Sequence, residues 1–594
     1  MKIKGLLIGM LACTALVGCN NEDVVNNDVK NGEEYYAVVS FSMPGNTSRA
    51  ASLGGFEHAT DDKEIKVNNA MFYFLDDAGK SVADACYIAN TQGGFNWETH
   101  IEGTTGDNVN ALTNSVIVMK NPTDIPSRIV ALINVGNLKL STNRPSLEQL
   151  QSVVGSYATT THTAIPTDGM VMSSTSYLDA TGAITIGAPV SANNIFESQE
   201  ELKKAVGDAA TDPMKAVAVV IPVEKVLAKV TVAQGANFEQ DEETTTLGSL
   251  TDAGTSGNAA TATTNNVKLT VQINGWWLDS TPTHSYLLKD INNVNVGDWW
   301  NDLANTRSYW ANSYEGDNPA QGYANDQYAT QAAIGNSLYT QENTSMPIDK
   351  PEQGNDGDDN VYDGNNRTKV VVAATLKNGN SAVSLVKWYG NYYTKEGFLI
   401  SLANLNDVKK YYIKTTSGEG DTYTSLTKDD LQIVANTDKD EAGTEIGTGN
   451  QNNVVVNDKE IRNYEAAVKL ANDVTELYVV NSNGEFEAVK SLDDVNTELL
   501  NISKIQYWKD GKTYYYVEIE HNYDSETQTT YYGVVRNHLY KLTLDGVKGL
   551  GTPVPNPDKI IIPEKPADTY SETYISANIQ ILAYKVVSNN VTLE

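Results

Sequence analysis

The first segment with the pattern of a folded strand reads Tyr35-Tyr36-Ala37-Val38-Val39-Ser40-Phe41-Ser42-Met43. Apolar side chains occupy every odd position, and serines stand at positions 40 and 42. Because successive side chains of a strand point to opposite faces, this alternation predicts a β-strand with one buried face. The residues expected on that face are Tyr35, Ala37, Val39, Phe41 and Met43.

Short apolar and β-branched runs of strand length recur along the rest of the chain. Met71–Leu75 ends at the turn composition Asp76-Asp77-Ala78-Gly79, and Ile129–Val135 and Thr513–Glu520 are similar runs. Asp510-Gly511, between two such runs, predicts a two-residue hairpin turn. The segments with helical periodicity are short: Ser146–Val153, Ser198–Val206 and Tyr464–Asn472. This pattern predicts a mainly β protein of antiparallel β-sandwiches with few short helices.

A second alternating segment closes the chain, from Ile575 to Glu594. Eight of its ten odd positions are apolar, against three of its ten even positions, so it too predicts a strand with one buried face. The apolar odd positions are Ile575, Ala577, Ile579, Ile581, Ala583, Val587, Val591 and Leu593. The residues alone leave two interpretations equally open: the last strand of its own domain, or a strand that pairs with another molecule.

A processing signal precedes the first strand. Lys2 and Lys4 lead into the apolar segment Gly5–Val17, which is too short to span a bilayer and predicts a signal peptide. Leu16-Val17-Gly18-Cys19 matches a lipobox, which makes Cys19 the predicted lipidation site and the precursor a lipoprotein. The alternative is an ordinary signal peptide in which the cysteine is incidental.

A second processing signal follows the first strand. Arg49 stands within Asn46-Thr47-Ser48-Arg49-Ala50-Ala51, where small and polar neighbours are typical of an accessible cleavage loop. We predict proteolysis between Arg49 and Ala50. Such a cut would separate Tyr35–Met43 from the rest of the chain, which suggests polymerisation by strand replacement rather than catalysis.

Composition limits the classes of partner. The chain has 594 residues and a net charge of −32, which disfavours nucleic-acid binding and favours a self-repelling surface. Association must then come from a specific, dry contact. Cys13 lies within the signal peptide and Cys19 is the predicted lipidation site, so Cys86 alone remains and no intramolecular disulfide is expected in the mature chain.

The sequence offers no convincing catalytic, cofactor or metal motif, and we predict that the protein is not an enzyme. The six histidines lack metal-ligating spacing, and Asp438–Gly449 resembles a calcium loop that has Gly449 at the position of the bidentate glutamate. The pairs Trp276-Trp277 and Trp299-Trp300 could stack on sugar rings, although packing in the core is the more ordinary role for such residues.

One shift in composition suggests a domain boundary. Gln234–Asn266 is rich in Thr, Gly, Ala, Asn and acidic residues and predicts a long loop. We place the boundary just before it. The predicted organisation is a lipoprotein signal peptide (1–19), a propeptide with the removable strand (20–49), an N-terminal β-sandwich (50–222), a C-terminal β-sandwich with long loops (223–574) and a C-terminal strand (575–594).

Several segments resemble one known family. Tyr531–Leu542, which contains Gly533-Val534-Val535-Arg536-Asn537-His538, is the most specific; Lys512–Tyr516, Tyr339–Thr344 and Leu385–Tyr393 add to it. They resemble the major subunits of type V pili, the fimbrillins, and above all the shaft subunit of short (minor) fimbriae. Val223–Val230 is similar to the family's segment near the domain junction, although the family often has Arg where Lys225 stands.

The resemblance implies two transthyretin-like β-sandwich domains and a structural role in a surface fimbrium. It implies an outer-membrane lipoprotein precursor, cut by an arginine-specific protease that removes the first strand. The C-terminal strand of another copy then fills the vacated groove by donor-strand exchange, with anchor and tip subunits as further partners, in support of adhesion and biofilm formation. The alternatives are an anchor, tip or accessory subunit, or a surface glycan-binding lipoprotein that uses the Trp pairs.

Overall fold

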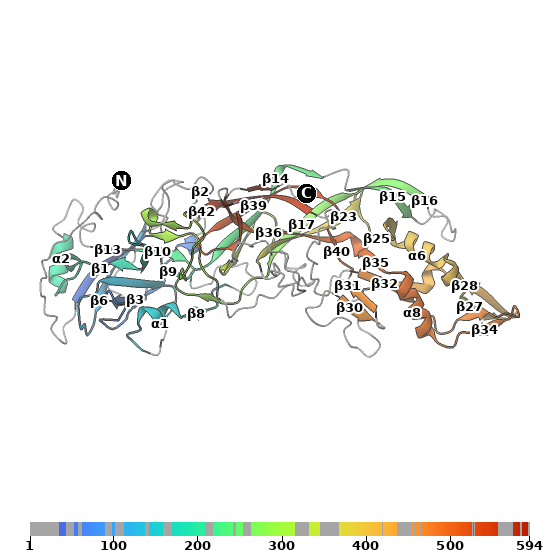
Figure 1. Cartoon of the computed structure of the whole chain (residues 1–594), viewed down its shortest axis with the longest axis horizontal. Helices are drawn as coiled ribbons and strands as arrows, with labels where there is room; N and C mark the ends of the chain where they lie inside the picture. The colour runs from blue at the N-terminus through green and yellow to red at the C-terminus, as the bar shows by residue number, and fades with distance from the viewer. Residues whose placement is uncertain are drawn as a thin grey trace.

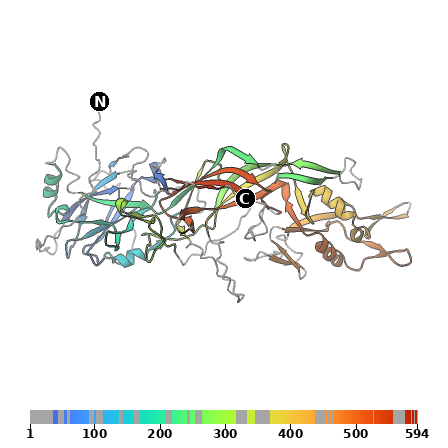
Figure 2. The same cartoon turned by 45° about the horizontal axis from the view of Figure 1, so that its top comes forward.

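In the computed structural model the chain is elongated and consists mainly of β-strands (Figures 1 and 2). The N-terminal half lies at one end, and the strands of residues 412–425 and 478–488 lie at the other. The structure describes residues 35–42, 53–56, 62–89, 98–100, 112–136, 140, 142–158, 169–207, 218–240, 245–252, 263–314, 332–344, 367–418, 420–435, 453–456, 459–462, 465–524, 527, 529–555, 574–582, 585–587 and 589–591.

The N-terminal half is built on a nine-stranded arrangement that folds over one core. Its order is β4 (Cys86–Ala89), β3 (Asn69–Leu75), β7 (Arg128–Ile133), β9 (Met172–Ser174), β13 (Ala218–Lys225), β1 (Tyr35–Ser42), β6 (Leu112–Met119) and β5 (Glu98–His100), with β12 (Ala188–Pro189) on β7. Strand β13 pairs with β1 up to Pro222 and with β9 from Val223 onward, so it joins two groups of strands. Both groups contribute to one buried cluster, as Phe72 and Ile117 illustrate.

The C-terminal half encloses a larger core between two further sheets. One sheet has the order β21 (Ser337–Thr340), β14 (Ala228–Gln240), β39 (Leu539–Lys548), β41 (Tyr574–Leu582) and β43 (Asn589–Val591). The other consists of β17 (Thr270–Asp279), β23 (Lys369–Asn378), β36 (Lys512–Glu518) and β40 (Thr552–Pro553), with β24 (Ser381–Ala382) on β23. Val230, Trp276, Val371 and Tyr540 are fully buried in the core that these strands share.

A separate core forms toward the end of the molecule that lies opposite the N-terminal half. A seven-stranded sheet packs there with helices α6 (Lys395–Ala403) and α8 (Leu492–Ile502). The order of its strands is β16 (Thr263–Lys268), β15 (Thr246–Asp252), β26 (Asn391–Thr394), β25 (Leu385–Trp388), β35 (Ile505–Trp508), β32 (Glu465–Leu470) and β29 (Leu431–Ala435). Beyond it lies a small sheet of β27 (Tyr412–Ser417), β28 (Gly420–Ser425), β33 (Tyr478–Val480) and β34 (Phe486–Ala488) (Figure 1).

The mainly β class is confirmed, and so are two of the predicted helices. Helix α1 (Leu147–Gln151) begins at Ser146, whose side chain and that of Gln149 form a reciprocal capping box, and α2 spans Gln199–Gly207. The predicted helix Tyr464–Asn472 is wrong, because this segment forms β32. Ala466, Ala467 and Val468 are all buried, and a strand buried on both faces loses the alternation that identifies strands in a sequence.

Two other predictions of local structure need correction. Much of Gln234–Asn266 is strand rather than loop: β14 continues to Gln240, and β15 pairs with β16. The backbone ladder holds these strands together where large apolar side chains are few. Asp510 and Gly511 do form a tight turn with positive φ angles, 53° and 70°, but β35 and β36 on either side of it belong to different sheets and form no hairpin.

Candidate assembly site

The strand predicted to be removable lies inside the N-terminal sheet. β1 pairs in parallel with β13 along one side and antiparallel with β6 along the other. Tyr35 lies opposite Met119, and Ala37 lies opposite Ile117, and all four side chains are buried in one cluster. The predicted buried face is therefore confirmed at Tyr35 and Ala37.

The register extends the same arrangement along β1. Val39 lies opposite Ser115 and Val219, and Phe41 lies opposite Thr113 and Ile221; the side chains of Val39 and Phe41 and the whole of Met43 lie outside the described residues. On β13, Val219 and Ile221 are buried, whereas Val220 between them is 51% exposed. In the part of β13 that pairs with β1, buried and exposed side chains therefore alternate, as they do in a strand with one buried face.

Loss of β1 would open a groove between β6 and β13. The backbone groups of both strands that now pair with β1 would lose their partners, and the core side chains under β1 would lose their cover. Buried backbone groups without partners are costly, and an open strand edge recruits another strand. Only a strand with one apolar face would restore both ladders and the core. Arg49 and Ala50, at the predicted cleavage site, and Cys19, the predicted lipidation site, lie outside the described residues.

The C-terminal segment lies on its own chain in this structure. β41 pairs antiparallel with β39, and its odd positions lie opposite buried residues: Ile575 opposite Val547, Ala577 opposite Leu544, Ile579 opposite Leu542 and Ile581 opposite Tyr540. The segment was predicted as one strand, but its described residues form three: β41, β42 (Lys585–Val587) and β43.

The later positions of the predicted strand have different partners. Val587 on β42 lies opposite Leu53, and Val591 on β43 lies opposite Ala577. Ala583 and Leu593 lie outside the described residues. The single chain thus shows the first of the two interpretations left open by the sequence, a terminal strand on its own domain.

The two halves of the chain meet at a short link that is surrounded by buried charges. Only Val226 and Leu227 separate β13 from β14, which starts the C-terminal sheets. Glu64 of the N-terminal half accepts a hydrogen bond of 2.6 Å from Lys229 Nζ on β14. Glu224 on β13 pairs at 2.7 Å with Lys289 Nζ, and both of these side chains are fully buried.

Burial lowers the pKa of two lysines at this junction, Lys225 and Lys289. It lowers the pKa of Lys225 to about 8, although the nearby Glu64 carboxylate acts in the opposite direction. It also lowers the pKa of Lys289, an effect that the Glu224 carboxylate counteracts. Taking a charge out of water is expensive, and a carboxylate in contact offsets part of that cost.

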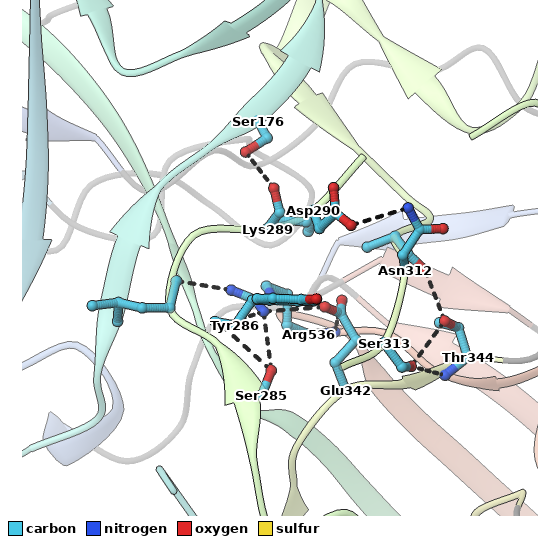
Figure 3. Close-up of polar contacts among 12 residues, drawn as sticks. Ser176, Ser285, Tyr286, Lys289, Asp290, Asn312, Ser313, Glu342, Thr344 and Arg536 are labelled. Carbon is cyan, nitrogen blue, oxygen red and sulfur yellow. Dashed lines mark hydrogen bonds and ion pairs between the residues drawn. The ribbon is translucent and has the colours of Figure 1, made fainter. Parts of the chain in front are cut away.

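Arg536, from the motif that carries the family resemblance, is a central residue of this junction (Figure 3). Its guanidinium pairs with Glu342 at 3.1 Å and donates to the carbonyl oxygens of Leu287 (3.0 Å) and Tyr286 (2.7 Å) and to Ser285 Oγ (3.1 Å). Strand β18 (Ser285–Tyr286) pairs with β8 (Val154–Gly155) of the N-terminal half. Arg536 therefore holds the strand that reaches back to the other half.

The two residues after Arg536 hold the link itself. The backbone N–H of Asn537 donates to the carbonyl of Leu227 at 3.0 Å, and the N–H of Lys229 donates to the carbonyl of His538 at 2.9 Å. Asn537 has a φ of 56°, a conformation that asparagine tolerates better than most residues. The sequence identified Arg536-Asn537-His538 as family-specific without a role. The structure places Asn537 at the link between the halves, where its side-chain Oδ1 also accepts a hydrogen bond of 3.4 Å from the N–H of Lys225 on β13.

Two features weighed in the sequence, a metal-binding cluster and the tryptophan pairs, can be located among the described residues. No group of three or more His, Cys, Asp or Glu among them could hold a metal ion. Trp276, Trp277 and Trp300 are buried, and Trp299 is partly buried among Trp310, His521 and Tyr531. The exposed aromatic platform that the glycan-binding interpretation requires from these pairs is therefore not formed. No described helix is long and apolar enough to cross a membrane.

One family comparison matches a defined segment of the C-terminal half. Residues 506–590 match the family model described as major fimbrial subunit protein type IV, fimbrillin, C-terminal. This segment includes Arg536 and β41. The C-terminal part of the chain is thus similar to that of the fimbrillins.

Comparisons with whole proteins give weaker likenesses. A candidate cell adhesion protein from Parabacteroides distasonis shares 12% identity with a TM-score of 0.31, over 93% of this chain and 97% of that one. One from Bacteroides eggerthii shares 10% with a TM-score of 0.29, over 95% and 98%. A fimbrial assembly protein from P. distasonis shares 11% with a TM-score of 0.24, over 59% and 84%. TM-scores of this size do not establish a shared fold. No curated protein matches the sequence.

Proposed function

We propose that the protein is a structural subunit of a surface fimbrium, of the shaft type, that polymerises by protease-triggered donor-strand exchange and so supports adhesion and biofilm formation. The observation that carries the proposal is the position of β1. It is an interior strand with partners on both sides, yet it stands ahead of Arg49 in the chain, so one cut can free it. The fimbrillin match of residues 506–590 supports the same function.

The chain supplies its own replacement strand. The groove between β6 and β13 requires a strand with one apolar face, and residues 575–594 have that pattern. A terminal segment can leave its own sheet without unthreading a core. The replacement strand would come from another copy of the chain. The backbone ladder and the buried apolar face together determine which strand fits the groove.

The precursor would be an outer-membrane lipoprotein that is anchored through Cys19 and cut by an arginine-specific protease at the cell surface. Anchor and tip subunits would begin and end the fibre. An anchor subunit would keep its lipid. The mass of the surface protein therefore distinguishes an anchor subunit from a shaft subunit. Mature protein that starts at Ala50 and lacks acyl groups supports a shaft subunit, whereas protein that retains Cys19 and its lipid indicates an anchor.

The cleavage step can be tested directly with Arg49→Ala. We expect this variant to remain a folded, full-length monomer after treatment with an arginine-specific protease, while the wild-type protein forms fibres visible by electron microscopy. Lys30→Ala, in the same propeptide, serves as the control and should polymerise normally. Normal fibres from uncut Arg49→Ala protein would refute strand removal as the trigger.

A further inference from the structure

The two ends of the chain that the proposed function uses are paired with each other. Strand β2 (Leu53–Phe56) begins four residues after Arg49 and pairs antiparallel with β42 in the C-terminal segment. Leu53 lies opposite Val587 and Phe56 lies opposite Lys585, with an irregularity between them. The new N-terminal region of the cut protein therefore holds the segment that is proposed to leave.

The β2–β42 pair is short and forms a ladder of its own, although both of its strands contact the neighbouring β41. Within the described strands β2 and β42 form a two-stranded sheet, whereas the neighbouring β41 belongs to the five-stranded sheet with β39. A ladder of two short strands contributes little stability by itself, so its persistence depends on how the rest of the chain restrains it. In the uncut protein β2 is restrained from both directions.

Cleavage removes one of these restraints. Before the cut, residues 43–52 connect β2 to β1, which is fixed inside the N-terminal sheet, and residues 57–61 connect it to the 3-10 turn Asp62–Glu64. After a cut at Arg49, β2 is attached only through residues 57–61. Tethering a segment at both ends lowers the entropy cost of holding it in place, so release of one anchor weakens the pair.

We propose that the β2–β42 pair is an intramolecular latch, which keeps the C-terminal segment on its own subunit until cleavage at Arg49 loosens it. The latch rests on the proposed function. One cut then has two consequences: it frees β1 from the groove, and it loosens the segment that is to fill a groove elsewhere. Premature exchange between uncut precursors is thereby suppressed at both partners.

Proline within β2 tests the latch, since it cannot donate to the ladder and disrupts a strand pair. The variants are Leu53→Pro and Phe56→Pro, and the matched control is Ser52→Pro, just outside β2. Hydrogen exchange of residues 585–587 is measured on monomeric precursor and, at a dilution that prevents polymerisation, on cleaved protein. The growth of detergent-resistant multimers after addition of an arginine-specific protease is followed in parallel.

We expect residues 585–587 to be protected in wild-type and Ser52→Pro precursor and to keep only part of that protection after cleavage. Both variants within β2 should lack protection before cleavage and should polymerise several-fold faster after it. Equal protection in the precursors of all four proteins, or protection that cleavage leaves unchanged in the wild type, would overturn the latch. If cleaved wild-type protein forms no multimers, the proposed donor-strand exchange is refuted, and the latch is then judged from the hydrogen-exchange data alone.

Discussion

Arg536→Met is the perturbation that most sharply tests the junction between the two halves. The substitution keeps much of the apolar stem of the side chain but removes a guanidinium that is fully buried. Glu342 would lose its charged partner, and the carbonyl oxygens of Leu287 and Tyr286 would each lose a donor.

The expected cost is large because every one of these partners is inside the protein. Removal of one member of a buried ion pair typically costs about 3–5 kcal/mol. Arg144 supplies the matched control: its ion pair with Asp84 is close, 2.7 Å, but both side chains are 30% exposed. For Arg144→Met we expect a loss of at most about 1 kcal/mol, as is usual for surface pairs.

Urea unfolding of the precursor without its signal peptide, followed by tryptophan fluorescence, measures both losses. Trp299 and Trp310 pack beside His521 near this junction and should report on its opening. The double variant Arg536→Met with Glu342→Gln should recover part of the stability, because no unpaired carboxylate is then buried. If Arg536→Met lowers the free energy of unfolding no more than Arg144→Met does, the junction is not held by this charge cluster.

Three further predictions concern charge, the donor strand and the lipid. Because burial lowers the pKa of Lys225 to about 8, against 10.5 for an ordinary lysine, the unfolded chain binds more protons between these values. Wild-type stability should therefore rise relative to Lys225→Met between pH 8 and 9.5, by about 2 kcal/mol in urea unfolding, and parallel pH curves would contradict this. Ile581→Asp should give stable monomers that cannot extend a fibre, because it would bury an unpaired charge, whereas Gln580→Asp should polymerise; equal ladders on mild detergent gels would argue against exchange through this face. Intact-mass analysis of surface fibres should find a chain that begins at Ala50 and carries neither Cys19 nor acyl groups.

Sequence patterns predicted which face of a strand is buried wherever apolar and polar residues alternate along that strand. The buried face of β1 that carries Tyr35 and Ala37 could be predicted because apolar residues stand at every odd position of the segment. The strand Glu465–Leu470 was mistaken for a helix because both of its faces are buried, which erases the alternation. Turn chemistry located the turn at Asp510-Gly511 but could not tell which sheets the flanking strands join, since that depends on partners far away in the sequence.

The junction lay beyond sequence reasoning for a different reason. Glu64, Lys229, Lys289 and Arg536 are widely separated along the chain, and isolated charged residues ordinarily indicate a solvated surface. One signal did exist: the Arg536-Asn537-His538 motif was specific to a family and had no evident chemistry. The pairing of β2 with β42 likewise brings together the two ends of the chain, which no local pattern can reveal.

The central claim is that the groove between β6 and β13 changes occupant when the precursor becomes a fibre. A cryo-electron microscopy structure of fibres assembled from cleaved wild-type protein tests it most directly. We expect residues within 575–594 of one subunit to lie between β6 and β13 of the next, with their odd-numbered apolar side chains against Ile117, Val219 and Ile221. Fibres in which β1 still fills its own groove, or in which residues 575–582 remain on β39 of their own subunit while another segment fills it, would contradict it.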